Sequence, residues 1–191
     1  MKPTRAAEWR LTLWLAILVG ASCTFTLGFA CAVPLAAFGA MAALTLDLRH
    51  ALLLSIAVWL VNQIVGFAVL HYPTDAGSLI WGAMLGGIAV LSTLAPLMLA
   101  PRLERAGASL AVVALACFVC AFAVYEGGLL LISATVMGGT ENYTPAIIGR
   151  ILAINAAAFV GLGALNLLAR ASGVPLGLGT MAQPASSSSA V

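Results

Sequence analysis

Six apolar blocks, separated by short polar joins, follow one another along this 191-residue chain. A helix needs about 20 apolar residues to cross the roughly 30 Å hydrocarbon core of a bilayer, and most of the blocks reach that length. Hydrophobic residues make up 63% of the chain and charged residues only 7%, whereas a soluble domain is about 25% charged. Because so few charges cannot cover the surface of a water-soluble fold, we expect the chain to lie in a membrane.

The blocks are rich in Leu and Ala and lack the alternation of a transmembrane β-barrel, so they predict an all-α bundle of six transmembrane helices. The first block follows a basic start, as a signal peptide does, but it continues past any expected cleavage point and is interpreted as a retained helix. Residues 1–170 form one predicted domain, and the polar, Ser-rich residues 171–191 a disordered cytoplasmic tail. The predicted spans lie at about 11–32, 34–46 (which is short), 51–70, 77–100, 108–128 and 146–169.

Positive charges indicate the orientation of these helices. With six spans, seven of the eight Lys and Arg residues fall on one side of the membrane and Arg150 on the other. The seven are Lys2, Arg5, Arg10, Arg49, Arg102, Arg105 and Arg170. By the positive-inside rule this side is the cytoplasm, so both termini are expected there in a multi-pass protein of the cell inner (plasma) membrane. Five spans, with the first two blocks merged, would scatter the charges over both faces.

Polar side chains within and beside the spans gather in the extracytoplasmic half of the predicted bundle. Such groups are costly in a bilayer and usually face a cavity or a partner helix, so we predict a pocket that opens to that side. The alternative is that each side chain ties two helices together or reaches the headgroups separately. The candidate substrate-binding residues are Asn62, Gln63, His71, Tyr72, Trp81, Glu126, Arg150 and Asn155.

A charged pair is one interpretation of Glu126 and Arg150. They are expected at similar depth on consecutive helices, where a shared site would lower the cost of burying each charge. Glu141 and Asp75 are the competing partners for Arg150.

Local signals at the outer joins leave two further alternatives. Gly127-Gly128 weakens the fifth block, so residues 129–137 form either a re-entrant segment over the pocket or the end of one long tilted helix. Asp75 or Thr74 is expected to cap the fourth helix.

Small residues recur at four-residue spacing on two predicted helices. Such faces let helices approach closely, and we expect them to pack within the chain, with a partner protein as the alternative. The first helix carries Ala16, Gly20, Thr24 and Gly28, and the fourth carries Gly82 and Gly86.

The four cysteines give no metal-site pattern. Cys117 and Cys120 share a face of the fifth helix and are interpreted as small packing residues. Cys23, Cys31 and His71 are the residues that would offer a ligand to the pocket, an option that the sequence leaves open. We predict no bound metal and no cofactor.

Familiar catalytic patterns are absent from the sequence. There is no phosphate-binding Gly-rich loop, no His-Glu-x-x-His and no Gly-x-Ser-x-Gly. We therefore expect no enzymatic activity and no catalytic residues. The net charge of +2 is explained by membrane topology and does not indicate nucleic-acid binding. Because the chain has no ATPase of its own, uphill transport would need a partner or an ion gradient.

About 190 residues, six helices, an outward pocket and a small-residue first helix together resemble the substrate-binding (S) component of energy-coupling factor vitamin transporters. The family has alanines at four-residue spacing where this chain has Ala16, Gly20, Thr24 and Gly28. The resemblance implies vitamin uptake: a small transport protein that binds a cofactor-sized substrate from outside and is energised by a transmembrane partner subunit and a separate ATPase. The small cobalamin-binding members use a cysteine as cobalt ligand. Metal-binding members carry an N-terminal His motif that this chain lacks.

Two other functions stay open. One is a non-enzymatic membrane assembly or accessory subunit, whose small-residue faces would pack on partner helices. The other is a membrane redox or cofactor-modifying enzyme that uses the four cysteines.

Overall fold

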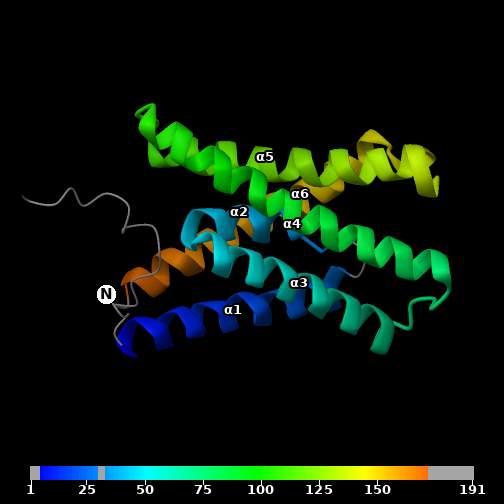
Figure 1. The fold of residues 1–191 in the computed structure, drawn as a ribbon, viewed down its shortest axis with the longest axis horizontal. Coiled ribbons are helices and arrows are strands. Elements are labelled where there is room, and N and C mark those ends of the chain that lie inside the picture. Colours follow the sequence, from blue (N-terminus) through cyan, green and yellow to red (C-terminus); the bar gives the residue numbers. More distant parts are fainter. Residues whose placement is uncertain (1–4, 30–32, 172–191) are drawn as a thin grey trace, which may run out of the picture.

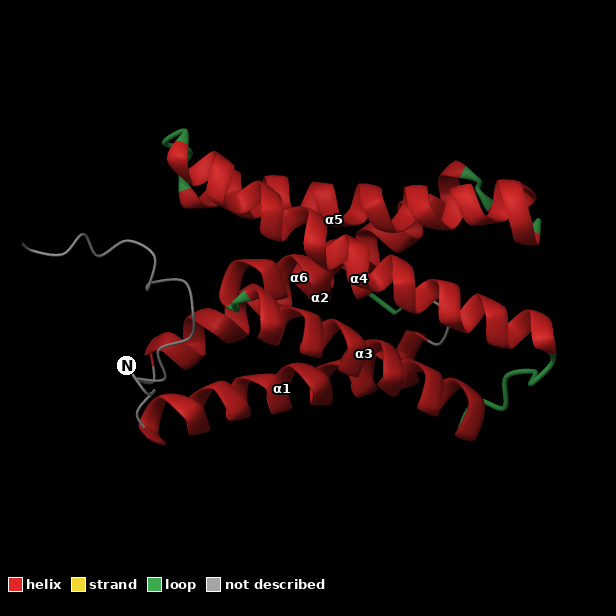
Figure 2. Cartoon of the chain, viewed as in Figure 1, coloured by secondary structure: helices red, strands yellow, loops and turns green. Residues whose placement is uncertain are grey.

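The structure, a computed structural model, describes residues 5–29 and 33–171. Within these ranges the chain forms a bundle of six α-helices joined by short connections (Figure 1, Figure 2). A π-helical turn, η1 (Ser133–Met137), and a 3₁₀ turn, η2 (Thr140–Asn142), follow the fifth helix. The six helices are α1 (Arg5–Phe29), α2 (Leu35–Thr45), α3 (Leu48–Ala68), α4 (Ala76–Arg105), α5 (Leu110–Ile132) and α6 (Pro145–Ala171). Among the predictions, those on Lys2, Cys31 and residues 172–191 fall outside the described residues.

Five of the described helices are long and apolar enough to cross a membrane, so the chain is a multi-pass membrane protein. The prediction of an all-α fold is confirmed. Successive helices run in opposite directions: α1, α3 and α5 point one way, and α2, α4 and α6 point the other way (Figure 1). The start of α1 and the end of α6 therefore lie at the same end of the bundle. The α2–α3 and α4–α5 joins lie there too, with Arg49 and Arg102, and we call it the basic end.

α2 departs from the prediction of six full spans. It has 11 residues, which at 1.5 Å per residue extend about 16 Å, roughly half of the hydrocarbon core. It begins after Pro34 and ends before Asp47, the N-cap of α3. A short apolar block has the same composition whether it faces lipid or protein, and here the whole run 33–42 is buried. α2 packs against α3, α4, α5 and α6 and forms the centre of the bundle.

The side chains of Asp47, Asp75 and Ser109 cap the first turns of α3, α4 and α5. Asp47 Oδ1 accepts a hydrogen bond from the backbone N–H of His50 at the start of α3. Asp75 caps α4 by accepting from both the backbone N–H and the hydroxyl of Ser78, at 3.0 and 2.9 Å. The backbone bond is the main reason that the pKa of Asp75 lies below its usual range. Of the two predicted caps, Asp75 is confirmed.

The path of α5 distinguishes a re-entrant segment from one long helix for the residues after Gly127-Gly128. The helix runs without interruption to Ile132 and continues into η1, so that 28 residues form one apolar span. The long-helix alternative is confirmed and the re-entrant alternative is wrong. The chain leaves this helix at Gly138 and Gly139, whose φ angles of 73° and 91° suit residues without a side chain.

α1 packs against α3 and turns its small-residue stripe away from the bundle. Trp14 and Leu18 are buried on the inner face, whereas the stripe is exposed at Ala16, Gly20, Thr24 and Gly28. No described atom lies within 4 Å of a Cβ added at either glycine. The prediction that this stripe packs within the chain is therefore wrong, because the larger side chains of the opposite face take up the contact.

The backbones of α2 and α4 approach closely at Gly39. A Cβ added there would lie 2.9 Å from the Thr93 hydroxyl oxygen and 3.0 Å from the Ser92 carbonyl oxygen. Pro96 lies inside α4 and has no N–H, so the Ser92 carbonyl lacks its usual helical donor. A residue without a side chain at position 39 lets α2 lie directly against this turn.

Gly39→Ala is expected to lower the stability of the folded bundle by about 1–3 kcal/mol, because the new methyl group overpacks the contact with α4. The thermal unfolding midpoint of the detergent-solubilised protein measures the change. Gly20→Ala is the matched control: the added Cβ meets open space, and Ala favours a helix by about 1 kcal/mol over Gly. Equal midpoints for the two variants would contradict the prediction.

Candidate functional site

A cavity of about 450 Å³ lies between α3, α4 and α5, and we call it the α3–α5 cavity. It is formed by the last turns of α3, the first turns of α4 and the join between them, which lie opposite the basic end (Figure 1). Small-molecule sites commonly have volumes of about 300–1,000 Å³. The described lining residues include no charged side chain. They include three non-aromatic polar residues (Asn62, Gln63 and Ser78) and four aromatic ones (Phe67, Tyr72, Trp81 and Tyr125).

Two glycines of α4 allow α3 to form one wall of this cavity. The Trp59 indole donates a 2.8 Å hydrogen bond to the carbonyl of Gly82, and a Cβ on Gly86 would lie 2.7 Å from the same ring. A Cβ on Gly82 would lie 2.5 Å from Gln63 Oε1, so the absence of a side chain at this position leaves room for the Gln63 amide. The small-residue face of α4 therefore packs within the chain, as predicted.

The join after α3 folds Tyr72 back over the helix. His71 has a φ of 55°, an uncommon conformation for a residue with a side chain, which turns the chain sharply here. The Tyr72 backbone N–H then donates to the Gly66 carbonyl at 3.0 Å. Its ring lies against Gly66 and meets Phe67 edge to face at 6.3 Å. Tyr72 thereby lines the cavity while His71 stays exposed.

The structure brings four of the eight predicted residues together: Asn62, Gln63, Tyr72 and Trp81 all line the cavity. The sequence interpretation missed Tyr125, Phe67 and Ser78. Phe67 lies four residues after Gln63, a spacing that places both on one helix face and would have identified it. Tyr125 lies beside the predicted Glu126 on α5 and carries no comparable signal.

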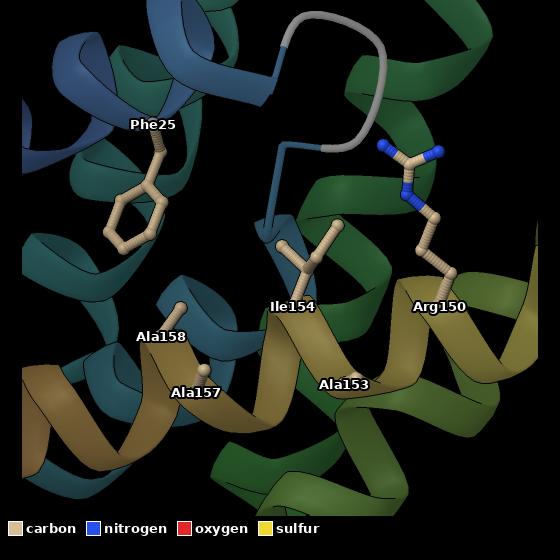
Figure 3. A pocket seen from close by; sticks show the side chains of 6 residues that line it. All are labelled: Phe25, Arg150, Ala153, Ile154, Ala157 and Ala158. Atoms are coloured by element: carbon tan, nitrogen blue, oxygen red, sulfur yellow. The ribbon is translucent and has the colours of Figure 1, made fainter.

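Glu126 and Arg150 are not paired. Glu126 Oε1 is buried without a hydrogen-bond partner, whereas Arg150 is exposed and lines a second cavity between α1 and α6 (Figure 3). The one ion pair within the described ranges joins His50 and Asp47, so neither Glu141 nor Asp75 pairs with Arg150. Depth along a helix does not determine which face a side chain occupies, and Arg150 faces α1.

The Asn155 side chain makes its hydrogen bonds within the protein. It is fully buried, and its Oδ1 accepts a 3.1 Å hydrogen bond from the backbone N–H of Ala37. Its Nδ2 donates to the Ile151 carbonyl at 3.0 Å. The first N–H groups of a helix have no partner within it, so Asn155 caps α2 from a distant helix.

None of the three cysteines in the described ranges is among the lining residues of the α3–α5 cavity. Cys117 is buried, and its thiol lies 3.8 Å from the Pro96 carbonyl oxygen. Cys23 and Cys120 are half-buried and free. In the part of the chain that the structure describes, no three His, Cys, Asp or Glu residues lie close enough to hold a metal ion.

Burial raises the pKa of Tyr143, in the join after η2, above its ordinary value. Ser133, at the start of η1, is buried and lies close enough to the Tyr143 side chain to oppose this shift. Negative charge on Glu126 adds to the increase. Tyr143 of the α5–α6 join therefore lies close to Ser133 at the end of α5.

Asn155→Ala is expected to destabilise the protein by about 1–3 kcal/mol, because it leaves a buried N–H of α2 without an acceptor. Thermal unfolding in detergent without added ligand measures this change. Asn62→Ala is the control, since no hydrogen bond joins the Asn62 side chain to another described residue, and it should shift the midpoint less. A larger shift for Asn62→Ala would contradict the capping role.

The chain matches no protein-family model, no curated protein and no solved structure. Its class therefore follows from its own helices: within the described residues it is a multi-pass membrane protein with five helices of spanning length, four of which pack against a buried half-length helix.

Proposed function

We propose that this protein is a small membrane transport protein that binds an uncharged, cofactor-sized substrate in the α3–α5 cavity. The observation that supports this most directly is the composition of the cavity. Amide, hydroxyl and aromatic side chains from three helices line about 450 Å³, and no charged residue is among the described ones. If the Asn62 and Gln63 amides served only the cohesion of the bundle, they would be expected to hydrogen-bond to other helices.

The amides of Asn62 and Gln63 are available for recognition. Neither side chain is hydrogen-bonded to another residue in the described ranges, although Asn62 is only 6% exposed. Neither amide is among the described polar atoms that are fully buried without a partner, so both can accept and donate hydrogen bonds to a ligand in the cavity. The rings of Tyr72, Trp81 and Tyr125 offer flat apolar faces beside these amides. Together they suit a planar molecule with hydrogen-bonding edges.

The charge distribution supports capture from outside. Arg49, Arg102 and Arg105 lie at the basic end, and the positive-inside rule assigns that end to the cytoplasm. Both termini are then cytoplasmic, in an inner (plasma) membrane, and the cavity opens to the extracytoplasmic side.

The exposed stripe of α1 supports an energising partner. Gly20 and Gly28 face away from the bundle with open space beside them, and small residues let a partner helix approach closely. In the S components that the chain resembles, this face receives a transmembrane subunit coupled to an ATPase. The same stripe also supports the alternative of an accessory subunit that binds partner helices and no substrate.

We expect the substrate to co-purify with the wild-type protein. Trp81→Ala is expected to weaken binding of this small molecule about tenfold, because it removes a stacking surface worth roughly 1.4 kcal/mol. Native mass spectrometry of the detergent-purified protein, with an absorbance spectrum of the same sample, identifies and quantifies the ligand. Ile80→Ala is the control, since Ile80 is the neighbouring residue of α4 and is 46% exposed. No ligand in the wild-type protein, or equal retention in both variants, would contradict substrate capture.

Gly20→Leu is expected to abolish co-purification of a stoichiometric membrane partner while leaving thermal stability and ligand retention unchanged, since the new side chain fills the stripe and its Cβ meets open space. Gly161→Leu on α6 is the matched control, because Gly161 is also exposed with open space around it. A partner lost in Gly20→Leu, together with a wild-type protein free of ligand, would favour the accessory-subunit alternative. A partner retained in Gly20→Leu would exclude this stripe as its contact.

A further inference from the structure

A second cavity, of about 390 Å³, runs along α6 where it faces α1. Five of its lining residues follow one face of α6, and Phe25 of α1 stands over the far end (Figure 3). Their spacing repeats with the helical turn, so they form a continuous row about 12 Å long. We call this the α1–α6 groove, and its row on α6 is Arg150, Ala153, Ile154, Ala157 and Ala158.

The groove is apolar along its length and cationic at one end. Apart from Ile154, the positions after Arg150 carry only methyl side chains, which leave a shallow channel on the helix surface. Ala153 and Ala157 are exposed, and this surface belongs to a helix that spans the membrane. The channel therefore opens to lipid, where an acyl chain is the natural occupant.

Arg150 has no counter-charge among the residues that the structure describes. It lies five residues into α6, about 8 Å from the start of the helix, which is headgroup depth for a long side chain that can reach outward. None of the described acidic groups forms an ion pair with it. Among the described arginines, Arg150 alone lies at the end opposite the basic end. A guanidinium at this depth matches a phosphate with two parallel hydrogen bonds.

We propose that the α1–α6 groove binds one anionic phospholipid, with its phosphate on Arg150 and one acyl chain along Ala153 to Ala158. Charge complementarity determines this occupant. A negatively charged headgroup neutralises a lone arginine, whereas a zwitterionic headgroup brings a competing cation. The row from Arg150 to Ala158 runs along α6, so an acyl chain that lies on it extends from directly beneath the phosphate. This inference concerns a different face from the α3–α5 cavity and does not rest on the proposed function.

The test is native mass spectrometry of the full-length protein in an uncharged detergent, titrated with palmitoyl-oleoyl-phosphatidylglycerol. We expect one tightly bound lipid in the wild-type protein and about tenfold weaker binding in Arg150→Ala, which loses the charged hydrogen bonds. Arg150→Lys should fall between them, because it keeps the charge and loses the planar fork. Ala157→Leu should also weaken binding, because its side chain fills the channel.

Arg102→Ala is the matched control. Arg102 is an exposed arginine at the basic end whose side chain donates to the Met98 carbonyl of its own helix, so its loss should leave lipid binding unchanged. Equal lipid binding by wild type and Arg150→Ala would overturn the proposal, as would equal weakening in Arg102→Ala. Inorganic phosphate that binds as tightly as the lipid, with no effect of Ala157→Leu, would show an anion site without an acyl chain. Arg150→Ala and Ala157→Leu change exposed positions, so the unfolding midpoints of these two variants without lipid should match that of the wild type. If Ala157→Leu does not fold, Ala153→Leu tests the same channel.

Discussion

The hydrogen bond from Ala37 to Asn155 satisfies the buried beginning of α2, and the rest of the bundle is organised around that helix. A helix that starts inside a membrane protein has no water for its first N–H groups, so another part of the chain must supply an acceptor. α6 supplies it, at 3.1 Å. Because α2 packs against four of the other helices, this contact sets the relative position of α3, α4, α5 and α6.

The short length of α2 also explains where the α3–α5 cavity lies. α3, α4 and α5 surround α2 near the basic end and continue past its beginning toward the opposite end (Figure 1). Beyond that point α2 no longer lies between them. The close contacts at Gly39 and Gly82 hold α4 against α2 and then α3, so the helices stay together on both sides of the gap and aromatic side chains line what remains.

Much of this fold is predictable from the sequence, because apolar length and charge position are local properties of each block. The meeting of Asn62, Gln63, Tyr72 and Trp81 is predictable for the same reason, since they share one end of the bundle. The errors concern helix rotation and partners. A buried amide looks the same in a sequence whether it caps a helix, as Asn155 does, or contacts a ligand. Likewise, small residues indicate close packing without showing whether the neighbour belongs to the same chain.

The long sequence separation of the α2 cap has a consequence for biosynthesis. Ala37 and Asn155 are 118 residues apart, and at synthesis rates of about 5–20 residues per second the acceptor follows the donor by roughly 6–24 s. During that interval α2 is too short to span the bilayer and its first turn lacks its acceptor. The bundle can therefore close only after the last helix has been inserted, and a chain truncated before α6 would expose an incomplete core to cellular quality control.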